Sequence, residues 1–140
     1  MKRHANLWQD VVSFQNLYLA YAKARKGKLS RNEVARFGFN LENELLNLQQ
    51  ELENGIYFPG NYRLFKIYER KPRIISAAPF KDRVVHHALM NIIEPLLDKR
   101  LIFDTYACRK GKGVHKAVDR YQKWSIRDLC ITPPPNMDKC

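Results

Sequence analysis

Residues 62–75 read Tyr62-Arg63-Leu64-Phe65-Lys66-Ile67-Tyr68-Glu69-Arg70-Lys71-Pro72-Arg73-Ile74-Ile75. Aromatic and β-branched residues lie on both sides of a charged segment, as two strands joined by a turn require. The stretch therefore predicts a β-hairpin with basic residues crowded at its tip. The segments around it have helical periodicity, so the predicted fold is α+β, mostly helical with a basic β-hairpin.

Two amphipathic helices are predicted before the hairpin. A first apolar face, at steps of four and three, consists of Leu7, Val11, Phe14, Tyr18 and Tyr21. Ser30 and Glu33 have the spacing of a capping box. A second apolar stripe follows them at Val34, Phe37, Leu41, Leu45, Leu48 and Leu52. This second helix is expected to end near Asn54-Gly55. The basic connection 23–28 is either a solvated linker or a nucleic-acid contact.

A third helix is predicted after Pro79, beginning Asp82-Arg83-Val84-Val85-His86-His87-Ala88-Leu89. Its buried side is expected to carry Val84, Val85, Ala88, Leu89, Ile92, Ile93 and Leu96. Pro95 should kink or end it, because proline lacks a backbone donor. Asp82 and Arg83 could form a local ion pair at its start.

Beyond the third helix, the chain has a loop that reads Tyr106-Ala107-Cys108-Arg109-Lys110-Gly111-Lys112-Gly113. A short basic helix with Val114, Ala117, Val118 and Tyr121 on one face follows it. The last residues contain three consecutive prolines, which favour an extended, disordered tail over residues 125–140.

The 140-residue chain has a formal net charge of +11. Such a charge on one domain usually means a polyanionic partner, because lysine and arginine that neutralise phosphates release condensed counterions. The excess lies in the second half. Residues 61–83 hold seven basic and two acidic side chains, and residues 99–127 hold nine and two. The phosphate-facing surface is therefore expected there.

Several classes of protein are disfavoured by composition. No apolar run approaches the roughly 20 residues of a membrane-spanning helix, and the amino end lacks the apolar core of a secretory signal. A cytoplasmic location is expected, without a membrane partner. The three cysteines form no close pair, which argues against disulfides and a zinc site. His86 and His87 would point about 100° apart on a helix, so no metal site is expected. One of them is expected to pack under the sheet.

The hairpin, the third helix and the glycine-lysine loop follow one another in an order that resembles bacterial reverse transcriptases. From about Leu7 to Trp124 the chain is similar to the fingers and the start of the palm in enzymes of retrons, group II introns and diversity-generating retroelements. The sequences of residues 75–89 and 106–113 are most similar to those of the enzymes of diversity-generating retroelements. The resemblance implies a fingers subdomain of a right-hand polymerase over residues 1–124, lacking most of the palm, and a divergent tail over residues 125–140.

The resemblance also implies binding residues. Arg73, with Lys66 or Lys71, would hold the triphosphate of the incoming nucleotide, since guanidinium groups bind phosphate oxygens bidentately. The residues expected to contact nucleic acid are Arg63, Arg70, Arg83, Arg109, Lys110, Lys112 and Lys116. In the loop, glycine would let the backbone approach a phosphate closely. The alternative for the loop is a flexible basic surface.

Catalysis in this family needs carboxylates that hold Mg²⁺, and no Asp-Asp pair occurs in the chain. No catalytic residue and no bound Mg²⁺ are therefore expected. The resemblance implies a truncated RNA-directed DNA polymerase that still binds an RNA template, a DNA or RNA primer and nucleotide phosphates. A small accessory protein is a further expected partner. The alternatives are a stand-alone basic RNA-binding or adaptor module, and a scaffold whose basic face meets an acidic protein.

Overall fold

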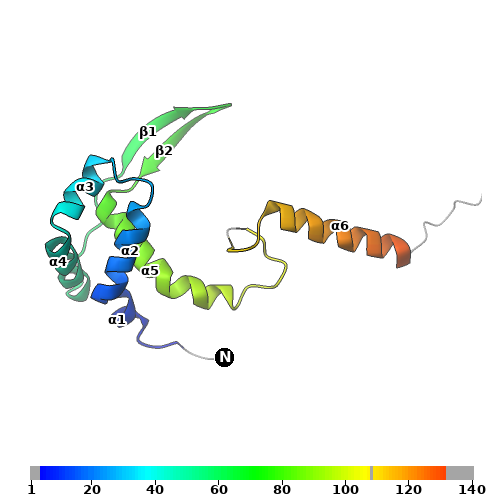
Figure 1. The fold of residues 1–140 in the computed structure, drawn as a ribbon, viewed down its shortest axis with the longest axis horizontal. Helices are drawn as coiled ribbons and strands as arrows, with labels where there is room; N and C mark the ends of the chain where they lie inside the picture. Colours follow the sequence, from blue (N-terminus) through cyan, green and yellow to red (C-terminus); the bar gives the residue numbers. More distant parts are fainter. Residues whose placement is uncertain (1–3, 108, 132–140) are drawn as a thin grey trace, which may run out of the picture. The chain divides into compact units, whose positions relative to one another are not determined.

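A computed structural model of the chain describes residues 4–107 and 109–131, the last five by their backbone alone (Figure 1). The elements in order are α1 (Leu7–Val12), α2 (Phe14–Arg25), α3 (Asn32–Phe39), α4 (Leu41–Glu53), β1 (Arg63–Tyr68), β2 (Pro72–Ala77), α5 (Phe80–Asp98) and α6 (Val114–Ile131). The predicted fold class is confirmed: the chain is α+β and mostly helical, with a two-stranded antiparallel hairpin. It divides into two compact units, Met1–Leu96 and Leu97–Cys140.

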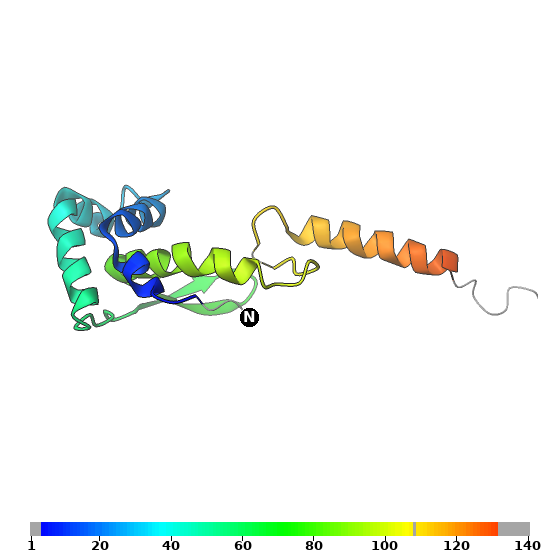
Figure 2. The ribbon, with the colours of Figure 1, turned by 90° about the horizontal axis from the view of Figure 1, so that it is seen from below.

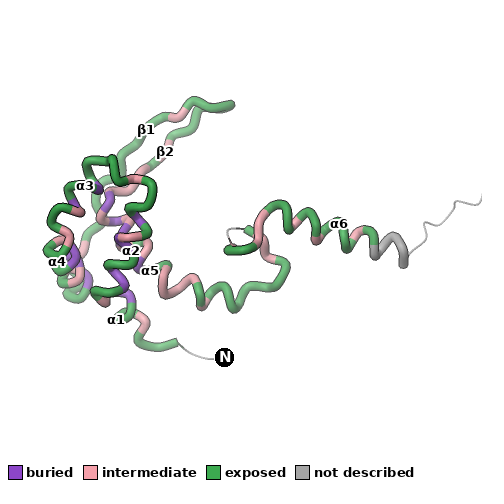
Figure 3. Tube along the Cα trace, in the orientation of Figure 1, coloured by how far each residue is buried: buried purple, intermediate pink, exposed green. Residues whose placement is uncertain are grey.

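The hydrophobic core of the first unit lies between its helices, and Figure 3 shows the buried positions on them. In the view from below, α4 runs across the direction of α5 (Figure 2). Three aromatic rings join α2, α3 and α5. Tyr21 stacks on Phe37 with 5.7 Å between ring centroids, and Phe80 meets Phe37 edge-on at 5.2 Å. Such pairs stabilise beyond the area they bury.

The first predicted helix is broken at Ser13. This residue has extended backbone angles and caps α2, since its Oγ accepts a hydrogen bond from the Asn16 amide at 3.4 Å. Because of this break, the buried face of α2 does not continue the buried face of α1. Leu17 and Tyr21 are buried, whereas Phe14 and Tyr18 are 38% and 48% exposed. The prediction of one continuous stripe was therefore wrong at Phe14 and Tyr18.

The second predicted helix is also two helices, divided at Asn40. Arg31 occupies the N-cap of α3 without a side-chain cap, so the predicted capping box of Ser30 and Glu33 does not form. The apolar stripe itself is confirmed across the break at Val34, Phe37, Leu45, Leu48 and Leu52. The predicted end is also confirmed, because Gly55 follows α4 with a φ of 68°.

The hairpin pairs β1 with β2 in the register Arg63↔Ala77 to Tyr68↔Pro72. Figure 1 shows it extending away from the helices of the first unit. Pro72 stands at the first position of β2, where the lack of a backbone donor is tolerated. Both faces are largely exposed, with only Ile67, Ile75 and Ala77 half-buried.

The start of α5 is fixed by a buried carboxylate. Asp82 is 3% exposed, and it accepts hydrogen bonds from the Tyr57 hydroxyl at 2.5 Å and from the Gly60 amide at 2.9 Å. The predicted local pair of Asp82 with Arg83 was wrong, because Arg83 turns instead toward Glu33. Pro95 lies inside α5, which continues to Asp98. On its predicted buried side Val84 and Ala88 are buried, but Leu89 is 38% exposed.

The second unit contains the loop and α6. None of its described side chains is buried. α6 continues to Ile131, so the backbone of residues 125–131 is helical where an extended tail had been predicted. Residues 132–140, with the three prolines, lie outside the described part of the chain.

Candidate nucleic-acid interface

The outer half of the hairpin, residues 66–74, here called its tip, presents four cations to solvent. Lys66, Arg70, Lys71 and Arg73 are all exposed. Within the described residues, none of the four has a hydrogen bond or ion pair with another side chain. Their charge is therefore available to a ligand. Three of these residues were predicted to bind nucleotide phosphates, and Arg70 to bind nucleic acid.

The register divides these cations between the two faces of the hairpin. Lys66 pairs with Ile74, whereas Arg73 pairs with Ile67. Paired residues share a face and neighbours along a strand alternate, so Lys66 and Arg73 lie on opposite faces. Lys71 precedes β2 in the turn. Of the two lysines predicted to assist Arg73, the geometry favours Lys71.

Arg63 and Arg83, also predicted contacts, lie where the hairpin joins the helices. Arg63 is the first residue of β1, and its Cζ lies 5.9 Å from the Phe65 ring centroid. The Arg83 Cζ lies 5.4 Å from the centroid of Phe80, and its Nη2 is 3.8 Å from Glu33 Oε2. The first unit thus has two basic regions, one at the hairpin tip and one at its base.

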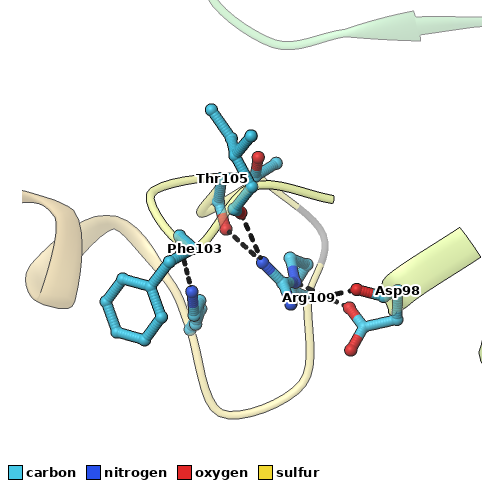
Figure 4. A network of polar contacts seen from close by, with 6 residues as sticks. Asp98, Phe103, Thr105 and Arg109 are labelled. Atoms are coloured by element: carbon cyan, nitrogen blue, oxygen red, sulfur yellow. Dashed lines mark hydrogen bonds and ion pairs between the residues drawn. The ribbon is translucent and has the colours of Figure 1, made fainter. Parts of the chain in front are cut away.

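In the second unit, Arg109 is held by the protein itself (Figure 4). Its Nε donates to Asp98 Oδ1 at 2.6 Å, and its Nη1 donates to the carbonyl groups of Ile102 at 3.0 Å and Thr105 at 3.3 Å. The hydrogen bond from Arg109 lowers the pKa of Asp98. Arg109 therefore organises the segment 98–105 and has few donors left for a phosphate.

Lys112 of the loop and Lys116 of α6 also have internal partners. Lys112 donates to the Phe103 carbonyl, and its Nζ lies 3.8 Å from the centroid of that ring. Burial and the charge of Arg109 lower the pKa of Lys112. Lys116 donates to the Gly111 carbonyl at 2.5 Å. Of the four cations predicted as contacts in this unit, only Lys110 is exposed without a partner in the described part of the chain.

Sequence reasoning missed Arg120 of α6. Its Nε donates to Asp104 Oδ1 at 3.0 Å, and its Cζ lies 5.3 Å from the Phe103 ring and 5.0 Å from Trp124. The spacing of Arg120 and Trp124, four residues apart on a helix, was the available signal. Lys112 and Arg120 form a cluster with the rings of Phe103 and Trp124. This cluster takes the place of a hydrophobic core in the second unit.

The two adjacent histidines differ in environment. His86 is exposed, whereas His87 is half-buried. Burial, followed by the charges of Lys23 and Lys28, lowers the pKa of His87 from its ordinary value of 6.5. His87 is thus influenced by the end of α2 and the segment after it. Its predicted packing under the sheet remains a prediction.

Among residues 4–107 and 109–131, no three His, Cys, Asp or Glu side chains are grouped so that they could hold a metal ion. The described residues thus offer no such group of ligands for the Mg²⁺ that the resemblance implies for the full-length family.

No helix in the described part of the chain has the length and apolar character needed to cross a membrane. A comparison with models of known protein families found no match, and a comparison with curated proteins found none either.

Proposed function

We propose that the chain is the fingers and start of the palm of an RNA-directed DNA polymerase, a fragment that binds template, primer and nucleotide phosphates without polymerising. The observation that carries this proposal is the hairpin tip, where Lys66, Arg70, Lys71 and Arg73 are exposed without partners in the described residues. Unpaired cations on an element that extends into solvent are suited to a polyphosphate or nucleic-acid backbone.

Binding of a primed RNA template, measured by fluorescence anisotropy over a series of salt concentrations, tests this function. Arg70→Gln should weaken binding and reduce the slope of log affinity against log salt by about one, as expected for the loss of one phosphate contact. Arg36→Gln is the matched control, because Arg36 is an exposed arginine of α3 without a partner in the described residues. Equal behaviour of the two variants would contradict a role for the hairpin.

The nucleotide site is tested separately with a deoxynucleoside triphosphate. Arg73→Gln and Lys71→Gln should be non-additive, because both side chains would contact one triphosphate. Arg73→Gln and Lys66→Gln should be additive, since the register places them on opposite faces. Extension of a primed RNA in the presence of Mg²⁺ tests the proposed inactivity, and synthesis of cDNA by the isolated chain would overturn it.

A stand-alone RNA-binding or adaptor module is the second candidate. One observation favours it: the buried core of the first unit consists of residues between Val11 and Ala88. The first unit therefore has a core of its own, as a stand-alone module requires. The triphosphate measurement separates the two candidates. A polymerase fragment should bind both RNA and triphosphate through the hairpin, whereas an RNA-binding module should bind RNA alone.

A further inference from the structure

Three arginines that are distant in the sequence meet at the base of the hairpin. Arg31 precedes α3, Arg63 begins β1 and Arg83 lies near the start of α5. All three line one cavity of about 80 Å³, together with Glu33 and Asn61. A wider groove of about 670 Å³ shares Arg31, Glu33 and Arg63 with this cavity, so the two adjoin.

The charges in this cavity are not balanced. Three guanidinium groups face one carboxylate, that of Glu33. The distance of 3.8 Å between Arg83 Nη2 and Glu33 Oε2 is too long for a hydrogen bond. Arg83 Nε is buried and has no hydrogen-bond partner among the described residues. Buried donors in proteins nearly always have an acceptor, so the guanidinium group of Arg83 is incompletely satisfied by the described residues.

The backbone of Arg83 is positioned by the contacts of the residue before it. Asp82 is held by the Tyr57 hydroxyl and the Gly60 amide. Gly60 lies so close to α5 that a Cβ there would be 2.9 Å from Pro79 Cγ. The first turn of α5 is therefore fixed against the segment that leads into β1. The backbone of Arg83 therefore needs less ordering when an anion binds than that of an arginine on a free loop.

We propose that this cavity binds one phosphate group of a nucleic-acid backbone that runs along the adjoining groove. Its small volume and its three guanidinium groups suit a compact anion such as a phosphate group. Arginine is the residue best suited to hold phosphate oxygens, through its planar fork of donors. The inference rests on the proposed nucleic-acid function, but its residues are separate from the hairpin tip. It adds Arg31 to the predicted contacts.

The test compares two substitutions in the full chain, one at the N-cap of α3 and one within that helix. Arg31→Gln and Arg36→Gln remove the same charge from exposed residues at or within α3, but only Arg31 lines the cavity. With a fluorescent single-stranded RNA, Arg31→Gln should weaken binding several-fold and reduce the salt slope by about one. Arg36→Gln should change neither quantity. Equal effects of the two substitutions would overturn the proposal.

Glu33→Gln provides a second and opposite change. It removes the carboxylate from the cavity, so RNA should bind more tightly than to the wild-type chain. Circular dichroism checks that the Arg31→Gln and Glu33→Gln variants are folded. Weaker RNA binding by folded Glu33→Gln would also overturn the proposal, because it would mean that the carboxylate, and not an added phosphate, organises the arginines.

Inorganic phosphate distinguishes a backbone phosphate from a free one. If phosphate alone binds at the cavity in calorimetry while Arg31→Gln leaves RNA affinity unchanged, the site belongs to a free anion and the proposal is wrong. Arg70→Gln separates the two proposals. If it weakens RNA binding but Arg31→Gln matches Arg36→Gln, only the cavity proposal fails. If the wild-type chain binds no RNA, the proposed function fails as well.

Discussion

At the scale of single residues, Asp82 shows why a local interpretation of sequence fails at a buried charge. Its neighbour Arg83 was the predicted partner, because rules for helix ends consider residues within a turn of one another. The actual donors are Tyr57 and Gly60, which are 25 and 22 residues away. The sequence indicated a helix start here, but the pairing depends on how the segment 54–62 returns to α5.

Replacing Asp82 by asparagine should lower the free energy of unfolding by about 2 kcal/mol. Asparagine keeps the size of the side chain, but its amide group would place a donor against one of the two donors that now bind the carboxylate. Urea denaturation measures this change. The control is Asp10→Asn, at an exposed position of α1, which should leave stability almost unchanged. A similar loss in both variants would show that the buried hydrogen bonds contribute little.

His87 should make stability depend on pH in mildly acidic solution. Burial, Lys23 and Lys28 hold its pKa below the value of 6.5 expected in the unfolded chain. The unfolded state therefore binds a proton more readily as the pH falls below about 6.5, and the folded state loses stability through this range. His87→Gln should flatten the profile between pH 7 and pH 5.

A histidine of the second unit supplies the control for that measurement. His115 of α6 is exposed and is not among the groups that lower the pKa of His87, so His115→Gln should keep the pH profile of stability of the wild-type chain. Denaturant midpoints measured at several pH values for the two variants decide the matter. Identical profiles would mean that a different group causes the dependence.

At the scale of elements, helix boundaries were harder to predict than helix faces. The stripe from Val34 to Leu52 was predicted correctly, although Asn40 divides it between α3 and α4. A stripe is preserved when the break does not change which side packs on the core. The break at Ser13 did change which side packs on the core, because the extended backbone of Ser13 rotates the buried face of α2 relative to that of α1.

Two serines before helices should respond differently to substitution. Ser13→Ala should cost about 1 kcal/mol of stability, because its Oγ caps the Asn16 amide. Ser30→Ala should cost much less, since Arg31, and not Ser30, occupies the N-cap of α3. Thermal or urea unfolding of both variants measures the difference. Equal costs would mean that Ser30 caps α3 in solution, as the sequence had suggested.

At the scale of the whole molecule, the buried residues are confined to the first unit. Every core residue lies between Val11 and Ala88, and residues 97–107 and 109–126 have no buried side chain. Charge patterns predicted basic clusters in both units, but sequence alone could not show that Arg109 and Lys112 would use their charge internally. That outcome depends on carbonyl groups exposed by the fold of the loop.

Hydrogen exchange should reveal this difference between the units. Amides of α2 and α4 should exchange slowly, because opening them exposes the core, whereas amides of α6 should exchange quickly. Mass spectrometry of the full chain after exchange in heavy water measures both regions at once. Protection of α6 equal to that of α4 would show that the second unit has a stabilising contact beyond the described residues.

The hairpin has a consequence for solubility. Its sheet has two strands in the described residues, so each strand leaves one edge without a partner, and such edges can add a strand from another copy of the chain. The cations at the tip oppose this by repulsion between copies. A polyanion that neutralises them removes the repulsion, so aggregation should be greatest where added phosphate charge just balances the protein and should decline when the polyanion is in excess.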